Sequence, residues 1–281
     1  YVPWNLMCRR RGANFRTLPF NERGEIDLEL FKSMLNEKTR LVAVNQVSNS
    51  LGTVNPVGEI IRLAHAFDVP VLVDAAQSVQ HLAHDVRALD ADFYVFSSHK
   101  MYGPMGIGVL YGKEKWLEAL PPFMSGGEMI DIVTPEKVTF NVLPFKFEAG
   151  TPNVAEAIGL GAAIDYLGQF DPLELQKHEE DLLAYGLKLL ADIPDMIIYG
   201  APSQRSSILP FNIRGIQHYD MGVLLDTMGI AVRTGQHCTQ PIMDALHVSG
   251  TVRASIALYN NRTDMDKLAY GVQRAVKMLK R

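Results

Sequence analysis

The chain has 281 residues, of which 47% are hydrophobic and 21% charged, a composition typical of a globular protein rather than a disordered one. Its net charge of −4, with one short basic run at residues 9–11, argues against a nucleic-acid partner. No apolar stretch is long enough to span a bilayer, and no metal site is expected. The two cysteines, Cys8 and Cys238, cannot form a disulfide framework, so we expect a cytoplasmic protein without a membrane partner.

The first half of the chain alternates short apolar runs with a helical pattern. Four runs rich in Val, Leu, Phe or Tyr are typical of strands buried on both faces, at 41–47, 69–73, 92–96 and 106–111. Between the first two, residues 56–67 repeat apolar side chains at helical spacing after a proline. Strands that alternate with helices predict an α/β fold with a mostly parallel sheet.

The pattern changes near residue 153. Thr151 followed by Pro152 predicts the N-cap and first turn of a helix that ends near residue 167. Beyond it we expect helices at 173–193, 221–228 and 264–279, and strands at 196–199, 208–213 and 252–258. This order predicts a smaller α+β domain over residues 154–281, after a large domain over residues 1–153.

Polar side chains follow three of the predicted strands of the large domain. Asn49 follows the first strand, Asp74 the second, and Lys100 comes shortly after the third. Because ligands bind beyond the carboxyl ends of strands in open parallel sheets, an amide, a carboxylate and a lysine are expected at one edge. Taken singly, Asp74 could be a helix N-cap and Lys100 a solvated surface lysine. Their joint placement favours a ligand site.

The chemistry of this set suits an aldehyde cofactor with a pyridine ring. A lysine forms a Schiff base with an aldehyde, and a carboxylate facing a pyridine nitrogen keeps that nitrogen protonated, so that the ring accepts electrons. Hydroxyl and imidazole groups beside the lysine, as on Ser97 and His99, can hold a phosphate, although local turn bonding would also explain them.

Several segments carry a resemblance to a known family. Residues 71–77, VLVDAAQ, and 96–104, FSSHKMYGP, resemble the cofactor motifs of fold-type I pyridoxal-phosphate (PLP) enzymes of the class V aminotransferase group. Residues 233–238, RTGQHC, resemble the cysteine-bearing loop of cysteine desulfurases, closest to the SUF-type, or group II, branch. Segments 47–53, 147–153 and 252–255 match the same family in the same order, so the resemblance covers essentially the whole chain.

The resemblance implies a role for each cofactor-site residue. Lys100 would carry PLP covalently and later move protons as acid and base. Asp74 would pair with the pyridinium nitrogen, and Gln77 would bond the ring hydroxyl. Ser97 and His99 would bind the phosphate. The resemblance thus implies PLP as the cofactor of the large domain.

It also implies how substrate and a second subunit reach the site. Asn49 and Arg253 would hold the carboxylate of L-cysteine, since an arginine fork matches a carboxylate in bidentate fashion. A surface ion pair is the alternative for Arg253. In the family, the equivalent of Thr151 reaches the cofactor of the other subunit, which implies a homodimer, although Thr151 could be a simple N-cap. Residues 126–130, GGEMI, resemble a glycine-led hairpin near the partner active site, or form an ordinary turn.

Cys238 lies in a loop between a strand-like segment and Pro241, which is expected to start a helix. We place Arg233 and His237 in the same substrate site, where their charge would favour the thiolate. The resemblance implies that this thiolate takes sulfur from L-cysteine as a persulfide and leaves alanine. Because the loop is short, the resemblance also implies a dedicated acceptor protein of SufE or SufU type. Cys8, on a predicted helix, is expected to serve packing.

The chain begins Tyr1-Val2 without methionine, and in the family an earlier segment carries a cofactor-stacking histidine and a phosphate-binding threonine. We therefore expect the natural protein to include a further N-terminal part. The resemblance makes iron–sulfur cluster assembly the expected destination of the sulfur. The alternatives left open are a selenocysteine lyase, another class V PLP enzyme such as a kynureninase-like hydrolase, and a scaffold that has lost cofactor binding.

Overall fold

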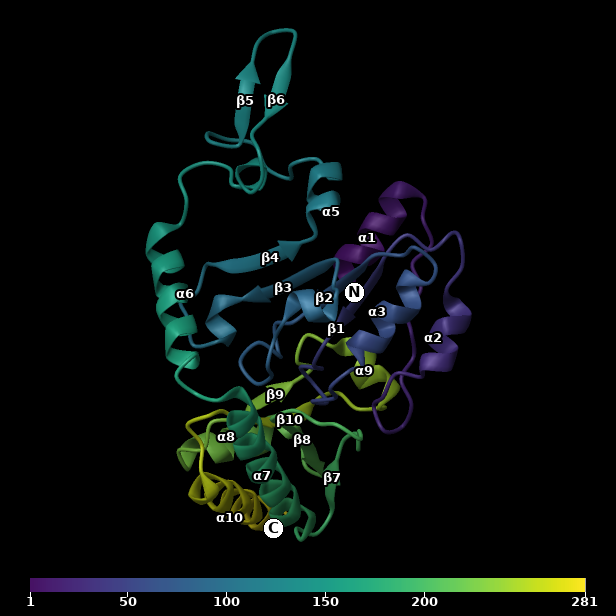
Figure 1. The fold of residues 1–281 in the computed structure, drawn as a ribbon. Helices are drawn as coiled ribbons and strands as arrows, with labels where there is room; N and C mark the ends of the chain where they lie inside the picture. The colour runs from purple at the N-terminus through teal and green to yellow at the C-terminus, as the bar shows by residue number, and fades with distance from the viewer. Residues whose placement is uncertain (281) are drawn as a thin grey trace.

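The computed structural model describes residues 1–280 and contains two four-stranded sheets (Figure 1). The strands of the first sheet lie in the order of the chain: β1 (Val42–Asn45), β2 (Val71–Asp74), β3 (Phe93–Ser97) and β4 (Gly108–Gly112). The first three are parallel and β4 runs antiparallel to β3. The predicted mostly parallel sheet is therefore confirmed, with strand limits that differ from the expected ones by a few residues.

Short helices surround the first sheet: α1 (Val2–Arg11), α2 (Leu28–Met34), α3 (Val57–His65), α4 (Val86–Leu89) and α5 (Glu114–Ala119). Helix α3 was predicted from its apolar spacing, and its buried residues include Ile60, Ile61 and Ala64. They share one hydrophobic cluster with Val71 and Val73 of β2. The one polar residue of β2, Asp74, stands at its carboxyl end, beyond these buried valines.

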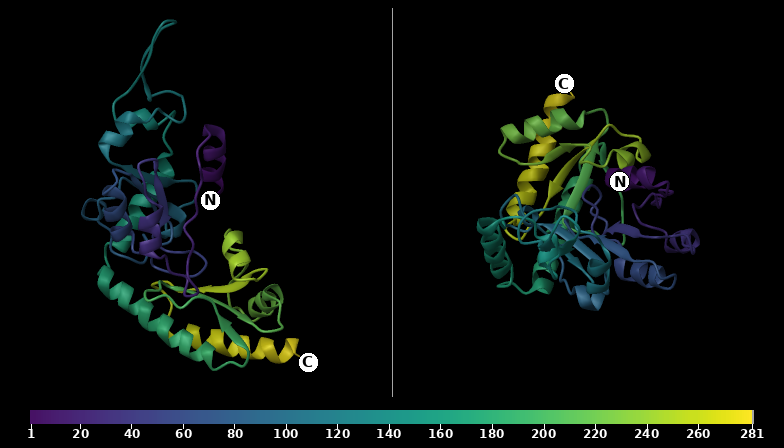
Figure 2. Two further views of the ribbon diagram at one scale, coloured as in Figure 1. Left: turned by 90° about the vertical axis from the view of Figure 1, so that its right-hand side faces the viewer. Right: turned by 90° about the horizontal axis from the view of Figure 1, so that it is seen from above.

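The second sheet has the order β7-β8-β10-β9 and is antiparallel throughout. Its strands are β7 (Met196–Ile198), β8 (Ile208–Ile213), β9 (Arg233–Gly235) and β10 (Thr251–Ser255). Its helices are α7 (Pro172–Ala191), α8 (His218–Thr227), α9 (Gln240–Ala245) and α10 (Arg262–Leu279). Helices α7 and α10 pack together on the side of this sheet that faces away from the first sheet (Figure 2, left).

Each sheet has its own hydrophobic cluster, and that of the second includes Leu209, Phe211, Leu225 and Val252. This separation is compatible with two domains, but the boundary near residue 153 stays a prediction. Arg281, the last residue of the second predicted domain, lies outside the described residues. Within residues 1–280, no helix combines the length and the apolar composition needed to cross a membrane.

Helix α6 (Val154–Leu167) begins later than predicted. Its N-cap is Asn153, whose ψ of 73° is not helical and whose side-chain amide donates to the carbonyl of Gly106 at 3.2 Å. Thr151 and Pro152 therefore precede the helix, and the expectation that Thr151 is the N-cap is wrong. Strand β10 ends at Ser255, three residues before the predicted end at residue 258, although the N–H of Ile256 still donates to the carbonyl of Ser207 opposite it.

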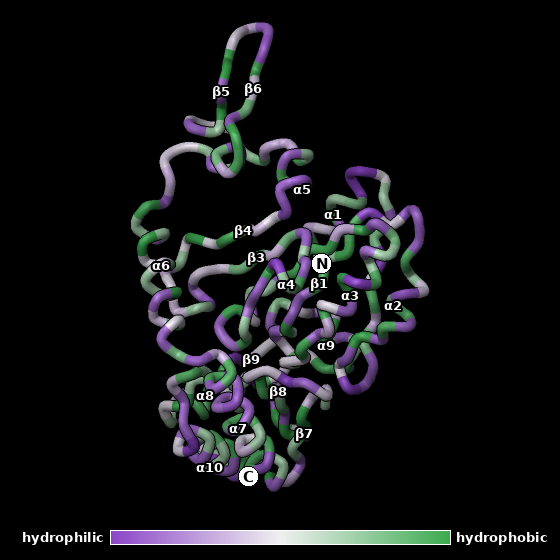
Figure 3. The backbone as a smooth tube through the Cα atoms, in the orientation of Figure 1, coloured by the Kyte–Doolittle hydropathy of each residue, from purple (hydrophilic) through white to green (hydrophobic). Residues whose placement is uncertain are grey.

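A two-stranded hairpin, β5 (Ile130–Val133) and β6 (Val138–Phe140), projects from the molecule, and Figure 3 shows hydrophobic stretches along it. All four residues of β5 are exposed. The glycine-led turn expected at residues 126–130 thus does lead into a hairpin. Helix α1 also has no buried residue, so packing accounts for Cys8, which is half-buried, less completely than expected.

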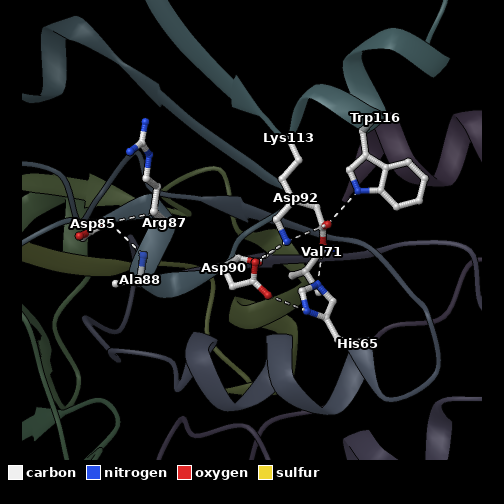
Figure 4. Close-up of polar contacts among 9 residues, drawn as sticks. All are labelled: His65, Val71, Asp85, Arg87, Ala88, Asp90, Asp92, Lys113 and Trp116. Carbon is white, nitrogen blue, oxygen red and sulfur yellow. Dashed lines mark hydrogen bonds and ion pairs between the residues drawn. The ribbon is translucent and has the colours of Figure 1, made fainter.

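Asp92 organises the edge of the first sheet opposite to the carboxyl ends of β1 to β3 (Figure 4). Its carboxylate, buried to 2% exposure, accepts hydrogen bonds from His65 Nε2 at 2.7 Å, Val71 N at 2.9 Å and Trp116 Nε1 at 2.8 Å. Lys113 Nζ lies 3.3 Å from the same carboxylate. These donors hold the pKa of Asp92 below its usual value although burial opposes them. They tie α3, β2 and α5 together at the edge where β2 and β3 begin.

Candidate active site

Asp74 and Lys100 lie at the same edge of the first sheet, where β2 and β3 end. Strands β2 and β3 are parallel neighbours in which Asp74, the last residue of β2, is paired with Val95, two residues before β3 ends at the same edge. Ser97 is the last residue of β3, and Lys100 ends the 3₁₀ helix η1 (Ser98–Lys100) that follows directly. The structure therefore brings the predicted carboxylate and the predicted lysine to one edge, where the sequence placed them.

A compact turn sets the position of Lys100. The carbonyl of Ser98 accepts hydrogen bonds from the backbone N–H groups of Met101 at 2.9 Å and Gly103 at 3.1 Å, while Ser98 N donates to Ile107 O. A Cβ atom on Gly103 would lie 2.1 Å from Ser98 Oγ, so only glycine fits without a shift. Sequence reasoning missed the roles of Ser98 and Gly103, because this contact depends on how the turn folds back on itself.

The side chains around Lys100 are available to a ligand. Gln77, Ser97 and Lys100 are half-buried and His99 is exposed, and none of these side chains has a hydrogen-bond partner among residues 1–280. Asp74 is exposed and accepts only the N–H of Ala76, at 2.9 Å. An amine, a carboxylate, an amide, a hydroxyl and an imidazole thus lie at or just after the ends of two neighbouring strands, with polar atoms available to a ligand. This donor set fits a phosphorylated pyridine aldehyde.

A second group of predicted residues meets between the two sheets. The side-chain amide of Asn49 donates to the carbonyl of His237 at 2.7 Å, and Arg253 Nη1 donates to the carbonyl of Asn49, also at 2.7 Å. Arg253 on β10 is paired in register with Arg233 on β9. Arg233 Nη2 in turn lies 3.9 Å from Cys238 Sγ. All five residues predicted for substrate binding and sulfur transfer therefore form one continuous cluster.

The backbone of the Cys238 loop is held in an unusual conformation. His237 and Cys238 have φ values of 55° and 60°, in the left-handed region that non-glycine residues rarely occupy. Each such residue costs on the order of 1–3 kcal/mol unless its surroundings impose the conformation. The His237 ring is buried, and its Nε2 lies 2.8 Å from Thr251 Oγ1 and 3.2 Å from Thr251 O. Cys238 itself is exposed.

Thr251 was not identified from the sequence, since a threonine at the start of a strand resembles any other. Because the carbonyl of Thr251 can only accept, the nearby Nε2 of His237 carries the hydrogen and Nδ1 is the bare nitrogen. Nδ1 is buried without a hydrogen-bond partner within residues 1–280. The ring is thus fixed in one orientation by β10.

The electrostatics of the cluster correct one expectation. Burial above all, and then the charges of Arg253 and Arg233, lower the pKa of His237 to about 4. His237 is therefore neutral near pH 7 and cannot supply positive charge to a thiolate. That charge comes from Arg233, the arginine beside Sγ. Arg253 remains cationic, and its Nε is buried without a partner in the described chain, ready for an anion.

A buried pair of side chains connects the region of the first sheet with that of the second. His81 Nδ1 and Glu179 Oε2 form a buried pair at 2.7 Å, and Ser207 Oγ donates to the same Glu179 oxygen at 2.5 Å. This pair joins the segment after β2 to α7 and was not foreseen.

Thr151 is exposed and makes no side-chain hydrogen bond within residues 1–280, so its predicted role toward a second subunit stays a prediction.

A mostly parallel sheet that presents lysine and carboxylate at one edge, beside a second, antiparallel sheet, is the arrangement of fold-type I PLP enzymes. The family model for class-V aminotransferases matches residues 1–268, and the chain belongs to that family, whose members use PLP. Cysteine desulfurases of Dickeya dadantii and Klebsiella pneumoniae are 48% and 47% identical to it over 279 residues, which are 99% of this chain and 68% of theirs.

Solved structures agree with these relatives. The cysteine desulfurase CsdA of Escherichia coli superposes with a TM-score of 0.95 at 41% identity, covering 99% of this chain and 69% of that one. The cysteine desulfurase of Thermococcus onnurineus gives a TM-score of 0.94 at 33% identity, covering 99% and 70%. The fold predicted from the sequence is therefore confirmed.

Proposed function

We propose that the protein is a PLP-dependent cysteine desulfurase that converts L-cysteine to L-alanine and keeps the sulfur as a persulfide on Cys238. One observation carries the proposal: an exposed thiol stands on a loop that a hydrogen bond of 2.7 Å joins to Asn49, in the segment that follows β1 at the sheet edge of Lys100. The relatives that match 99% of the chain are named cysteine desulfurases.

PLP, when bound, would supply a ring that accepts electrons from the substrate. The side chains without partners at the sheet edge support an assignment of its ligands. Lys100 Nζ would hold the aldehyde carbon, and the Asp74 carboxylate would keep the ring nitrogen protonated. Gln77 would bond the ring hydroxyl, while Ser97 and His99 would donate to the phosphate. The amine of Lys100 would also take and return protons at the substrate carbons.

Arg253 and Asn49 bind the substrate carboxylate. Arg253 Nε has no partner within residues 1–280, and a guanidinium can bind both oxygens of a carboxylate through parallel N–H donors. Asn49 adds an amide donor from the segment that follows β1. Arg233, in register with Arg253, raises the positive potential at the same place. No acidic side chain forms an ion pair with either arginine in the described chain.

Sulfur transfer takes place at Cys238. Its thiolate, favoured by Arg233 at 3.9 Å, attacks the substrate sulfur and forms a new S–S bond. The bond between the substrate sulfur and its carbon breaks, and the electron pair stays on that carbon. Lys100 then gives this carbon a proton, so the amino acid leaves as L-alanine and the transferred sulfur remains on Cys238 as a persulfide. No external oxidant or reductant is needed for this step.

The finer assignment follows from the loop and the hairpin. The short segment between β9 and α9 and the RTGQHC motif support the SUF-type, or group II, branch and an acceptor protein of SufE or SufU type. The exposed hairpin of β5 and β6 and the exposed Thr151 support a homodimer with shared sites. Iron–sulfur cluster assembly is the proposed use of the sulfur, and two free cysteines support a cytoplasmic location.

Incubation with L-cysteine tests the proposal. We expect L-alanine and protein-bound sulfane sulfur from the parent, and a loss of at least a hundredfold in the Cys238→Ala variant. Cys8→Ala is the matched control and should keep full activity, since Cys8 lies on the separate helix α1. Equal turnover by the parent and Cys238→Ala would refute the role of Cys238. Lys100→Ala should lose the visible absorbance of bound PLP.

A further inference from the structure

The Cys238 loop is held from two sides by contacts of different kinds. Within its own sheet, the ring of His237 is bonded to Thr251 at 2.8 Å. Between the two sheets, the carbonyl of His237 accepts a hydrogen bond from the side-chain amide of Asn49 at 2.7 Å, over a sequence separation of 188 residues. The first contact stays within one sheet, whereas the second ties the loop to the opposite one.

The Asn49 contact is the one that a substrate can reach. Asn49 stands between His237, which accepts from its side chain, and Arg253, which donates to its carbonyl at 2.7 Å. A carboxylate held by Arg253 therefore arrives beside the same amide. Hydrogen bonds to a charged acceptor are roughly twice as strong as those to a neutral one, so the carboxylate outcompetes the carbonyl of His237.

We propose that Asn49 is a positioning residue that latches the Cys238 loop in the resting enzyme, and that the carboxylate of the bound amino acid takes over its amide and releases the loop. This inference rests on the proposed function, because it assumes that an amino acid binds at Arg253. With such a latch, the thiol of Cys238 becomes free to move only when substrate is bound.

The backbone of the loop explains why release has an effect. His237 and Cys238 both occupy the left-handed region, which is unfavourable for side chains of their kind and persists only where contacts impose it. Removing one of the two restraints lets the loop relax. A net intramolecular hydrogen bond corresponds to roughly a two- to tenfold change in an equilibrium, so the population of the relaxed loop should rise by that factor.

The rate at which iodoacetamide alkylates Cys238 measures this relaxation of the loop in the holoenzyme. The background variant Cys8→Ser leaves Cys238 as the remaining cysteine of the chain. L-Alanine, which carries the carboxylate but no sulfur, is the probe, and its saturation is followed by the change in cofactor absorbance. In the background enzyme, we expect saturating L-alanine to raise the alkylation rate roughly two- to tenfold.

Two variants separate the latch from a merely structural role. In Asn49→Ala, Cys238 should react as fast without L-alanine as the background enzyme does with it, and saturating L-alanine should add nothing. In Thr251→Val, which loses the hydroxyl but keeps the side-chain shape, the basal rate should rise and the response to L-alanine should remain. The two variants thus test whether the response to L-alanine depends on the contact between Asn49 and His237.

The latch is overturned if Asn49→Ala shows the basal rate of the background enzyme, if it still responds to L-alanine, or if L-alanine leaves the background rate unchanged. Failure of the proposed function is read separately, from the absence of L-alanine after incubation of the parent with L-cysteine. A protein that failed this turnover assay would still report, through the alkylation rate of Asn49→Ala, whether Asn49 holds the loop.

Discussion

Arg253 and Arg233 stand directly opposite each other on the antiparallel strands β10 and β9. Like charges in facing positions of a sheet are destabilising, and here burial and the charge of Arg233 both lower the pKa of Arg253. No ion pair to an acidic side chain relieves either of them within residues 1–280. The repulsion between the two arginines destabilises the protein without a ligand, whereas a bound carboxylate would offset it.

Replacement of Arg253 by lysine should therefore weaken substrate binding. Lysine keeps the charge but loses the planar fork that binds two oxygens at once, so we expect KM for L-cysteine to rise by roughly tenfold or more. Steady-state kinetics over a range of L-cysteine concentrations measures this change. The exposed Arg87→Lys is the matched control and should leave KM unchanged. An unaltered KM in Arg253→Lys would contradict the carboxylate site.

The buried His237 should make stability depend on pH. Its pKa falls from 6.5 in the unfolded chain to about 4 in the fold, so the unfolded chain binds the proton more readily between these values. The stabilisation is complete above pH 6.5 and is lost as the pH falls toward about 4. Its upper limit is about 3 kcal/mol.

Urea unfolding at several pH values measures this effect as a difference between two proteins. The parent should lose more stability than His237→Asn between pH 6.5 and about 4, because asparagine has no proton to gain in this range. The comparison cancels the contributions of the other titrating groups. Parallel stability curves for the two proteins would show that His237 is not held neutral by the fold.

The elements that were predicted well are those whose sequence signal is local. Helix α3 follows from the spacing of Ile60, Ile61 and Ala64, and strand β8 was expected at the residues where it occurs. The shared edge of Asp74 and Lys100 followed from one general rule, because parallel neighbouring strands end together. Periodicity and strand order are enough for such inferences.

The contacts that were missed depend on the tertiary fold. Thr251 is significant only because the ring of His237 reaches it from the neighbouring loop. The late start of α6 depends on the bond from Asn153 to Gly106, and Gly106 is 47 positions away in the chain. The pKa of His237 reflects burial, which the adjacent cysteine and arginine in the motif do not reveal. None of these relationships leaves a pattern in the local sequence.

Asp92 should contribute to stability without affecting the chemistry. Asp92→Asn removes a buried carboxylate that accepts from His65, Val71 and Trp116 and leaves donors without their charged partner, so we expect a loss of about 3 kcal/mol or more. Trp116→Phe removes one donor and should lose less, about 1–2 kcal/mol. Urea unfolding provides both values. Because Asp92 directly precedes β3 whereas Lys100 follows the other end of that strand, turnover per folded molecule should stay unchanged.

The close approach of Gly103 to Ser98 provides a test of the turn that carries Lys100. Gly103→Ala would place a methyl group 2.1 Å from Ser98 Oγ, so the turn must shift and PLP binding, measured by absorbance, should weaken. Ser98 Oγ is buried without a hydrogen-bond partner in the described chain, so Ser98→Ala should be nearly neutral, and the double variant should regain much of the lost binding. Gly161→Ala is the control, because a Cβ there meets no atom within 4 Å and alanine favours its helix α6. If Gly103→Ala bound PLP as well as the parent, Lys100 would not depend on this turn for its position.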